Sequence, residues 1–483
     1  MGRIFEERLT FDDALLLPSY SEVLPSEVDF SGFFCKKVSL KLPVASAPMD
    51  TVTESETAIA MALQGGIGVI HKNMPVAQQV EQVKRTKRQI NFVVTDPITI
   101  SPATTLSQVK ALVAAQGSSS FPVVENGKLV GMLTSRDFRF EKNSERRVIE
   151  LMTKQVVYET VNNLMEFSPE KAIEVLQRHR IEKLPLTDSQ GKLLGLVTYR
   201  DLTVSTKYPQ ATRDCNGRLV VAAAVSPLDD ARAQLLVEAG VDCLVVDSAH
   251  GNSKNVVEAV TRFCRLGVPI VAGNVCTADG AKRLIDAGAS GVKVGIGAGS
   301  ICTTRIISGC GSPQLSSILD CASACHEAGI PLIADGGIKY SGDAAKALAA
   351  GASCVMLGNF LAGTEESPGR AVIIDGKKFK KYRGMGSLSA MEQGSKDRYF
   401  QSSVNTSKKL VPEGIDGVVP FKGTIEETLY QLQGGIRSAM GYCGASNLAD
   451  FWKSKFVRIT HAGNVESHPH DVMITEEAPN YRR

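Results

Sequence analysis

The chain contains the stretch Gly291-Val-Lys-Val-Gly-Ile-Gly-Ala-Gly-Ser-Ile-Cys302, in which an apolar run passes into a glycine-rich loop. Its first five residues predict a short, buried β-strand. Gly295, Gly297 and Gly299 then alternate with other residues, and glycine lets a backbone turn tightly and approach a ligand closely. A buried strand that ends in such a loop predicts one unit of an α/β fold with a ligand beside the loop.

Apolar runs of this kind recur along the chain, so that it contains eight candidates for buried parallel strands. They span residues 44–48, 66–70, 220–225, 243–247, 269–274, 291–295, 331–337 and 354–359. Helical patterns lie between them, and those at 231–240 and 343–351 end on glycine, as helix C-termini commonly do. Eight such units predict a (β/α)8 TIM barrel, whose chemistry lies on the loops after the strands. A doubly wound open sheet is the alternative, but no G-x-G-x-x-G opens a first unit.

The gap between the second and third predicted strands is too long for one helix and contains an internal repeat. Residues 127–138 recur as 191–202, and each copy predicts the order strand, turn, strand, helix. Surface loops tolerate insertions. We therefore expect a separate module at 92–205, with repeats at about 92–148 and 149–205, inserted into a catalytic barrel formed by 1–91 and 206–483.

The duplicated pattern resembles a tandem pair of CBS domains (a Bateman module), which is a nucleotide-sensing fold. In that family a Thr-x-x-Asp unit holds ribose, and here this unit is Thr134 with Asp137 and Thr198 with Asp201. The same residue types also cap helix N-termini. Both interpretations stay open on the sequence alone.

Composition limits the classes of function. The 483 residues include 54 basic and 51 acidic side chains and carry a net charge of +3, which gives no electrostatic case for nucleic acid or membrane binding. The eleven cysteines include no C-x-x-C pair, and the charged N-terminus does not resemble a signal peptide. Free thiols in a cytoplasmic protein are the simplest interpretation. No apolar run reaches the roughly 18–20 residues of a membrane helix.

Cys302 is the candidate nucleophile. It lies at the tip of the glycine-rich loop among hydroxyl side chains and close to Arg305. Nearby cations and free backbone N–H groups lower the pKa of a thiol, and the thiolate is the reactive form. A small buried cysteine in a glycine-rich turn is the alternative, which we favour for most of the other cysteines but not for this ligand-facing loop.

The loops after the last two strands predict a phosphate site, because barrels commonly hold phosphate there. Both loops supply glycine amides, which can donate hydrogen bonds to a phosphate. Asp335 precedes the first pair of glycines, and its carboxylate would repel a phosphate, so we expect it to accept hydrogen bonds from ribose hydroxyls. The predicted ligand is a nucleoside monophosphate, and its candidate contacts are Ser300, Asp335, Gly336, Gly337, Gly358 and Asn359.

Polar residues also end the fourth and fifth strands. Asp247 and Asn274 could bind a second ribose, as in a dinucleotide, or could cap the following helices. His250 is a weak candidate for a general base. His468 and His470 do not form a zinc site, since the sequence contains no Cys/His cluster with zinc spacing.

Residues 377–433 break the alternation of strands and helices. A long irregular segment in a compact domain is often a lid. We expect a mobile flap at about 383–410, within this segment.

Taken together, the motifs at 297–305, 382–387 and 397–401 closely resemble the bacterial type of the inosine 5′-monophosphate dehydrogenase family, over essentially the whole chain. The resemblance implies that Cys302 adds to C2 of IMP and that hydride passes to NAD+. It also implies that Arg398 then activates water for hydrolysis, helped by Tyr399 and Thr304, with Glu413 as a secondary proton route. This reaction yields XMP and is the committed step of guanine nucleotide synthesis.

The resemblance also implies the binding residues and partners. Those for IMP are Ser300, Asp335, Gly336, Gly337, Gly358, Asn359, Tyr382, Gly384, Met385, Gly386 and Glu413, and those for NAD+ are Asp247, Ser248, Asn274, Gly295 and Gly297. Carbonyls of Gly297, Gly299 and Cys302 would bind K+, completed by Glu466, Ser467 and His468 of a neighbouring subunit. The implied assembly is a homotetramer, possibly an octamer, with adenine or guanine nucleotides at the CBS module.

Two residues depart from the family pattern. Asn359 stands where a serine usually meets the phosphate, and Ala298 stands where proline is more usual, so altered contacts and a more mobile loop are expected. One rival interpretation is GMP reductase, which needs no hydrolytic flap. Another is a non-catalytic CBS assembly protein that senses nucleotides, against which Cys302 and Arg398 argue together.

Overall fold

The computed structural model describes residues 6–481 apart from 89–92, 95–96, 117–118, 163, 165–166, 200–201, 203–206, 402 and 405. The chain divides into two compact units. The first comprises residues 1–89, 210–214 and 219–483, and the second comprises 90–209 and 215–218. Each unit has its own sheets and its own hydrophobic core.

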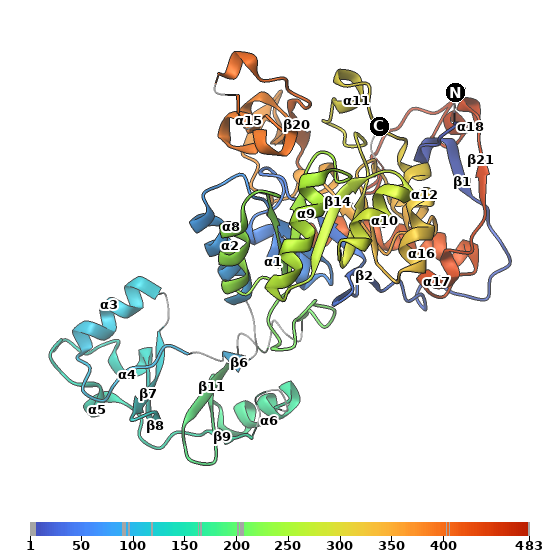
Figure 1. Ribbon diagram of the computed structural model, residues 1–483. Helices are drawn as coiled ribbons and strands as arrows, with labels where there is room; N and C mark the ends of the chain where they lie inside the picture. Colours follow the sequence, from blue (N-terminus) through green and yellow to red (C-terminus); the bar gives the residue numbers. More distant parts are fainter. Residues whose placement is uncertain are drawn as a thin grey trace. The chain divides into compact units, whose positions relative to one another are not determined.

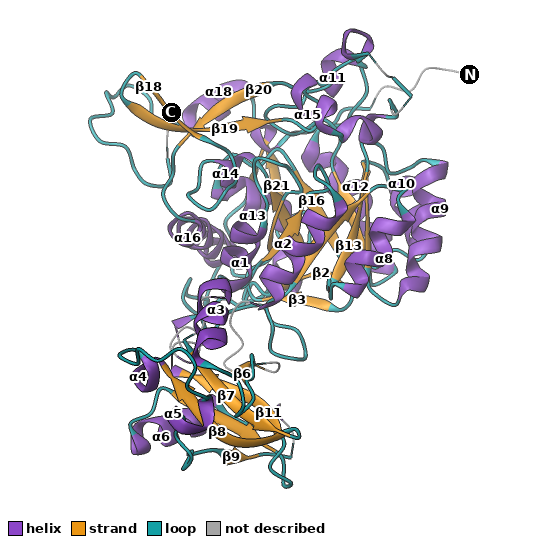
Figure 2. Ribbon diagram, turned by 90° about the vertical axis from the view of Figure 1, so that its left-hand side faces the viewer, coloured by secondary structure: helices purple, strands orange, loops and turns teal. Residues whose placement is uncertain are grey.

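The first unit is a closed barrel of eight parallel strands, which confirms the predicted (β/α)8 fold (Figures 1 and 2). The eight apolar runs singled out in the sequence are its strands. In barrel order these are β12 (Val221–Val225), β13 (Cys243–Asp247), β14 (Ile270–Val275), β15 (Gly291–Val294), β16 (Leu332–Asp335), β17 (Cys354–Leu357), β4 (Val44–Ser46) and β5 (Ile67–Ile70). The ring closes where β12 pairs with β5 in parallel.

Helices surround the strands, as Figure 2 shows. The main ones are α1 (Ser55–Leu63), α2 (Val76–Arg88), α8 (Asp230–Glu238), α9 (Lys254–Phe263), α10 (Ala278–Asp286), α12 (Gln314–Glu327), α13 (Ser341–Ala349) and α16 (Ile425–Cys443). Side-chain caps start several of them, such as Asp229 on α8 and Thr277 on α10. The short α11 (Thr304–Ile307) and α14 (Asn359–Ala362) lie in the loops after β15 and β17.

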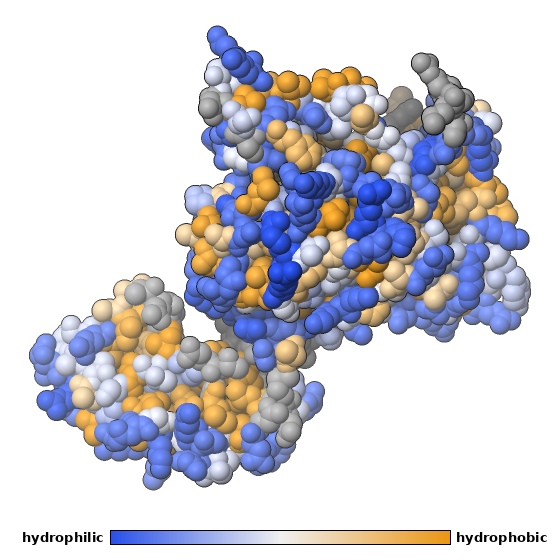
Figure 3. Space-filling view, in the orientation of Figure 1, coloured by the Kyte–Doolittle hydropathy of each residue, from blue (hydrophilic) through white to orange (hydrophobic). Residues whose placement is uncertain are grey.

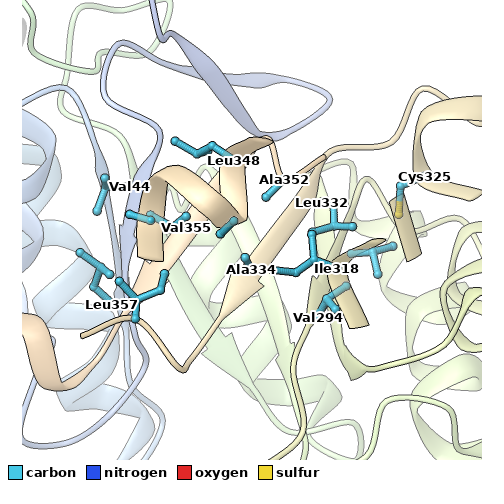
Figure 4. Packing of buried hydrophobic residues seen from close by; sticks show 14 of the residues in the cluster. Val44, Val294, Ile318, Cys325, Leu332, Ala334, Leu348, Ala352, Val355 and Leu357 are labelled. Carbon is cyan, nitrogen blue, oxygen red and sulfur yellow. The ribbon is translucent and has the colours of Figure 1, made fainter. Parts of the chain in front are cut away.

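The strands bury both faces, which explains their continuous apolar runs. Val221, Ala223 and Val225 of β12 belong to the layer between strands and helices, whereas Ala222 and Ala224 point into the barrel. The hairpin of β2 (Gly32–Cys35) and β3 (Val38–Leu40) packs into the same interior cluster. Figure 4 shows the outer layer, where strand side chains meet helix side chains; the labelled residues are Val44, Val294, Ile318, Cys325, Leu332, Ala334, Leu348, Ala352, Val355 and Leu357.

The helix surfaces follow the same division between buried and exposed faces. In α9, Val256, Ala259, Val260 and Phe263 are buried, and hydrophilic side chains cover the face turned to solvent (Figure 3). Within the described residues, no helix is both long enough and apolar enough to cross a membrane.

The segment expected to be irregular is partly regular, so that prediction is wrong in part. β18 (Ala371–Ile374), β19 (Lys377–Arg383) and β20 (Asp416–Pro420) form an antiparallel three-stranded sheet. The lysines of β19 hide the strand pattern, although Lys380 and Tyr382 alternate as its buried residues. Between β19 and β20 lie α15 (Leu388–Gln393) and the 3-10 turns η4 (Ser395–Tyr399) and η5 (Ser407–Lys409). Figures 1 and 2 place α11 and α15 at the same end of the barrel.

The remaining short elements of the first unit lie near its termini. The 3-10 turn η1 (Phe11–Asp13) precedes β1 (Ala14–Leu16), which pairs antiparallel with β21 (Phe456–Arg458). The helices α17 (Leu448–Phe451) and α18 (His461–Glu466) flank β21 in the chain.

The second unit repeats one arrangement of helix, strand and strand. The first copy has α3 (Leu106–Gln116), β7 (Ser120–Glu125), β8 (Lys128–Thr134), α4 (Ser135–Phe138) and α5 (Val148–Leu151). The second has β9 (Glu159–Thr160), α6 (Pro169–His179), β10 (Lys183–Thr187) and β11 (Leu193–Thr198), and β6 (Val93–Val94) joins its sheet. The tight turns use left-handed residues at Gly127 and Gly191, which suit glycine. The CBS interpretation of this unit remains a prediction.

The repeated Thr-x-x-Asp unit acts as a helix cap in its first copy. The backbone N–H and the hydroxyl of Thr134 both donate to Asp137 Oδ2, at 2.7 and 2.8 Å. In the second copy Thr198 ends β11, and Asp201 lies outside the described residues. Binding of ribose by these residues remains a prediction.

A buried lysine fastens both connections of the barrel to the inserted residues. Lys87, in the last turn of α2, places its Nζ 2.8 Å from Asp214 Oδ2 and 2.8 Å from Asp242 Oδ2. Asp242 also accepts the backbone N–H of Val221 at the start of β12. The residue before the insertion and the residue after it are therefore tied to the N-terminal end of the strands.

Candidate active site

A cavity of about 370 Å³ opens at the carboxyl ends of the strands. This volume is within the usual range of small-molecule sites. Of the residues predicted for the site, those that line it are Asn274, Gly295, Gly297, Gly299, Ser300, Cys302, Asp335, Gly336, Gly337, Gly358, Asn359, Tyr382, Gly384, Met385, Gly386, Arg398, Tyr399 and Glu413. Loops from several strands and the segment after β19 thus converge on one cavity.

Cys302 lies in the loop between β15 and α11 and faces this cavity. Its thiol donates to Thr304 Oγ1 at 3.1 Å, so Thr304 lies beside the sulfur although it does not line the cavity. The N–H of Cys302 donates to Gly299 O at 3.1 Å, and the N–H of Thr303 donates to Glu413 O at 2.9 Å. A bridge pairs Cys302 with Gly414. The loop that contains Cys302 is therefore held by residues 413–414, which lie between the predicted flap and β20.

Arg305 has a structural contact that the sequence did not suggest. Its Nε and Nη2 donate to Ile296 O at 3.1 and 3.0 Å, and Nη2 also donates to Ser312 O at 2.5 Å. Burial lowers the pKa of this guanidinium. The side chain ties the two ends of the loop together, while its charge stays in the neighbourhood of Cys302.

The glycines after β16 allow close packing around the cavity. Gly336 has a φ of +93°, and a Cβ there would lie 3.3 Å from the backbone nitrogen of Gly299. The buried Tyr382 lies opposite, and a Cβ on Gly358 would be 3.2 Å from its hydroxyl. Burial raises the pKa of Tyr382, which keeps this phenol neutral and able to donate. Asn359 begins α14 at the same wall.

A buried lysine links the strand ends below the cavity. Lys293 of β15 is 1% exposed, and its Nζ lies 2.5 Å from Asn274 Oδ1 and 2.8 Å from Asp335 Oδ2. The same ammonium lies 3.7 Å from Asp247 Oδ1. Asn274 Nδ2 also donates to Asp335 Oδ2 at 2.9 Å. One cation thus orients side chains from β13, β14 and β16 and compensates the buried carboxylate of Asp247 and the partly buried one of Asp335.

The segment predicted to be a flap packs on the barrel through its 3-10 turn η4 (Ser395–Tyr399). Arg398 Nη1 forms an ion pair with Asp247 Oδ2, and the N–H of Ala249 donates to Arg398 O at 3.1 Å. Tyr399 packs against Gly386, where a Cβ would lie only 2.7 Å from the phenol ring. Lys72, in the loop after β5, lies 2.6 Å from both carboxylate oxygens of Asp397.

This docking sets the charge states of the turn. Burial would lower the pKa of Arg398, but Asp247, Tyr399 and Asp335 together outweigh burial and raise it. Burial would raise the pKa of Asp247, but Arg398, Lys293 and Lys72 together lower it. Burial raises the pKa of Tyr399 to about 12, against the opposing charge of Arg398. Arg398 is therefore a cation, Asp247 an anion and Tyr399 a neutral phenol around neutral pH.

Several predicted residues lie outside the cavity wall. Asp247 is covered by Arg398, and the hydroxyl of the buried Ser248 donates to Gly273 O at 3.3 Å. His250, the weak general-base candidate, is exposed. Ser467 Oγ donates to Gly463 O at 2.8 Å, and His468 Nδ1 lies 3.1 Å from the hydroxyl of Tyr481. Glu466 ends α18 next to them, and of these three residues His468 contacts the C-terminal segment of its own chain.

Sequence reasoning missed several cavity residues. Lys293 lies inside a predicted apolar strand, and a charge inside a strand that is buried on both faces must be paired, so this signal could have found it. Gln314 donates to Val294 O at 2.9 Å and to Asp335 O at 3.2 Å. Phe11 and Asp12 line the cavity from the N-terminal turn, and no local pattern indicates that.

The fold and the site together define a (β/α)8-barrel enzyme with a cysteine at the mouth of a nucleotide-sized cavity. Comparison with known proteins narrows this class. The family model described as "IMP dehydrogenase / GMP reductase domain" matches residues 8–470. The chain belongs to this family.

Individual relatives cover nearly the whole chain. Inosine-5′-monophosphate dehydrogenase of Bacillus subtilis is 51% identical over 489 residues, which cover 99% of this chain and 99% of that protein. The protein of the same name from Mycobacterium tuberculosis is 51% identical over 485 residues, covering 98% and 91%. The crystal structure of a GMP reductase variant from Trypanosoma brucei in complex with guanosine 5′-monophosphate matches with a TM-score of 0.86 at 38% identity, covering 97% and 99%.

Proposed function

We propose that the chain oxidises IMP to XMP with NAD+ through a covalent intermediate on Cys302. The observation that carries this proposal is the meeting of two groups in one cavity: the Cys302 thiol and the docked flap turn with Arg398 and Tyr399. A nucleophile allows a substitution to be split into two easier steps. A movable flap gives one cavity two successive arrangements. The relatives named inosine-5′-monophosphate dehydrogenase support the same reaction.

The substrate would lie against the loops after β15, β16 and β17. Glycine amides of 336–337 and 358, with Ser300 and Asn359, can donate to a phosphate. Asp335 Oδ2 is occupied by Lys293 and Asn274, which leaves Oδ1 to accept ribose hydroxyls. The purine would then extend to Cys302, whose sulfur adds to C2 while Thr304 stays beside it.

The residues around Asp247 fit a dinucleotide. Asp247 Oδ1 is a buried oxygen without a hydrogen-bond partner among the described residues, so it can accept from a ribose once Arg398 has left. NAD+ would supply the hydride acceptor. Asn274 is held by Lys293 and by its own bond to Gly295 O at 2.7 Å, which fixes its amide beside the cavity. Asp247, Ser248, Asn274, Gly295 and Gly297 remain the proposed contacts.

The docked turn fits the hydrolytic half of the reaction. While Arg398 is paired with Asp247 it keeps its proton, so it can stabilise a hydroxide but cannot accept a proton from water. Arg398 can act as a base only after its ion pair with Asp247 is broken, because that pairing keeps the guanidinium protonated. Glu413, which also lines the cavity, is the proposed secondary proton acceptor.

The decisive experiment follows NADH absorbance with the purified protein in K+ buffer. IMP with NAD+ is expected to give a rise, and GMP with NADPH is expected to give no change. Consumption of NADPH with GMP, without NADH formation from IMP, would establish the reductase instead. The 38% identity to a GMP reductase makes that second assay necessary.

The monovalent cation and the assembly are part of the same proposal. Carbonyls of Gly297, Gly299 and Cys302 belong to one tight loop, and backbone carbonyls can replace the hydration shell of K+. Gly299 O already accepts one bond and has a second lone pair left. Glu466, Ser467 and His468 of a neighbouring subunit in a tetramer or octamer would complete the shell. Removal of K+ should lower the rate, with Na+ as the control.

The inserted unit is proposed to be a tandem CBS module that binds adenine or guanine nucleotides. Its two copies share the order of helix and strands and place Thr134 and Thr198 at matching strand ends. Calorimetric titration of the full chain with ATP and GTP would test this, and Thr134→Val is expected to weaken binding at one copy.

A further inference from the structure

The docked turn carries two opposite charges in succession, and each has its own partner on the barrel. Asp397 accepts from Lys72, in the loop after β5, at 2.6 Å through both oxygens. Arg398 pairs with Asp247 at the end of β13. Departure of the flap therefore leaves one cation and one anion behind on the barrel, and both charges must find new partners or water.

Lys72 is the cation whose counter-ion moves with the flap. Its side chain is 9% exposed, and among the described residues Asp397 is its ion-pair partner. The other cations beside it keep partners that stay on the barrel or on the strand before the flap: Arg232 pairs with Asp229, and Arg383 pairs with Asp50. The backbone of Lys72 is held through its carbonyl by Arg232 Nη1 at 3.3 Å. The backbone of Lys72 therefore stays on the barrel when Asp397 leaves, and its ammonium then needs another partner.

The charges of Lys72 and Asp247 both act on the region of the barrel that the η4 turn covers. Lys72 is among the cations that lower the pKa of Asp247, so its field reaches that carboxylate. Lys293 Nζ forms ion pairs with both Asp247 and Asp335, at 3.7 and 2.8 Å. With the flap removed, Asp247 and Asp335 share one buried lysine, and this end of the region has a net negative charge. Lys72 provides a positive charge in a second cavity, which it lines together with Asp50.

NAD+ has the complementary arrangement, since its nicotinamide ring is a cation and its diphosphate is an anion. We propose that Lys72 binds the diphosphate of the dinucleotide and exchanges this partner for Asp397 when the flap docks. The inference rests on the proposed function. Once the ring had accepted a hydride from C2 of the substrate it would be neutral, and the dinucleotide would lose its electrostatic attraction to Asp247, whereas Arg398 would keep its charge. The same two barrel residues thereby favour the dinucleotide before hydride transfer and the flap after it.

The alternative is that Lys72 only fastens the flap. The two interpretations differ in the direction of one effect. If Lys72 were only a fastener, loss of either Lys72 or Asp397 would free the site and strengthen dinucleotide binding. If Lys72 binds diphosphate, Lys72→Met weakens binding while Asp397→Asn strengthens it.

The test is calorimetric titration of NAD+ into the full chain with Cys302→Ala and IMP present, where no turnover occurs. Lys72→Met should raise the Kd of NAD+ about tenfold or more, the usual loss of a hydrogen bond to a charged group. Asp397→Asn should lower it. Lys72→Arg keeps the charge and should retain affinity, and Lys84→Met on the exposed face of α2 is the matched charge control.

Two further readouts keep the inference falsifiable. The Kd of NAD+ should rise with salt, and this slope should flatten in Lys72→Met. Circular dichroism of each variant checks its fold, and Lys72→Arg provides the comparison if Lys72→Met does not fold. Equal strengthening by Lys72→Met and Asp397→Asn, or no change in the first, overturns the role of Lys72. Absence of NADH formation by the unmodified protein would instead overturn the proposed function.

Discussion

A buried lysine lies at each end of the barrel, and the two lysines differ in the groups that they contact. Lys87 lies at the N-terminal end of the strands, is 4% exposed and pairs with Asp214 and Asp242. Lys293 lies near the carboxyl ends, is 1% exposed and contacts Asn274 and Asp335. The chemistry is similar at both ends: one ammonium and two nearby carboxylates. Lys293 lines the cavity described above, whereas Lys87 lies at the opposite end of the strands, so burial of a charge does not by itself identify a functional site.

The difference lies in which groups each lysine holds. Lys87 fastens segments of the main fold, and burial raises the pKa of Asp242 in spite of the attraction to Lys87. Lys293 holds side chains that face the proposed ligands, so its loss should be seen in binding before it is seen in stability. Variants at the two ends can therefore separate structural from functional effects.

The largest effect is expected at the thiol. Cys302→Ala should lower turnover by at least about 10⁴-fold, because the covalent step is lost, while IMP still binds. Steady-state NADH formation and calorimetry with IMP measure the two quantities. Cys310→Ala, an exposed cysteine of the neighbouring loop, is the control. Equal losses of binding and turnover would contradict the role as nucleophile.

The next effect is expected at Lys293. Lys293→Met leaves Asp335 and Asp247 without their shared cation, and it should weaken IMP binding about a hundredfold. Calorimetry with IMP measures the change. Double substitution with Asp335→Asn removes one of the two carboxylates that have lost their cation, and it should recover any lost stability but not the affinity for IMP. Unchanged affinity in the single variant would show that the contact with Asp335 is only structural.

At the opposite end, Lys87→Met should act on stability. It removes the cation that contacts two largely buried carboxylates and is expected to lower the free energy of unfolding by about 3 kcal/mol. Urea unfolding measures this change, and kcat/KM of the folded fraction should stay the same. Adding Asp242→Asn should recover part of the stability. A change in KM for IMP would break the contrast between the two ends.

Arg398→Ala should separate the two half-reactions. Hydride transfer should persist, and hydrolysis should slow by about a hundredfold, because the docked cation that stabilises hydroxide is gone. Rapid mixing should then show a burst of NADH followed by a slow steady rate. Lys396→Ala in the same turn, which donates to Val404 O, is the control. A steady time course without a burst would contradict the hydrolytic role.

The smallest effect is a pH dependence of flap docking. The docked Tyr399 has a pKa raised to about 12, whereas an undocked phenol titrates near 10. The equilibrium constant for docking is therefore unchanged well below pH 10, falls to about half at pH 10 and keeps falling as pH rises toward 12. The hydrolytic rate should fall in this window, and Tyr399→Phe should not show the fall. Tyr430→Phe, at an exposed position, should behave like the unmodified chain.

The sequence predicted the barrel well because strands buried on both faces are apolar without interruption. All eight runs became strands, and the cavity formed where their glycine-rich ends meet. The lysine-rich β19 hid an antiparallel sheet, since its exposed positions dominate the pattern. Lys293 and Lys72 were missed because their partners come from other strands and from the flap. Contacts of this range follow from barrel closure and not from local spacing.

The Lys87 contact has a consequence for rebuilding the chain. Lys87 and Asp214 meet through their side chains, and Gln210 precedes Asp214 by four residues, so the two attachment points of the insertion lie close together. A linker of at most about eight residues can bridge the gap between residues 88 and 210 at about 3.3 Å per residue. Replacing 89–209 with such a linker should give a minimal barrel that keeps Lys87, Asp214 and Asp242. The inserted unit is, in genetic terms, a removable cassette.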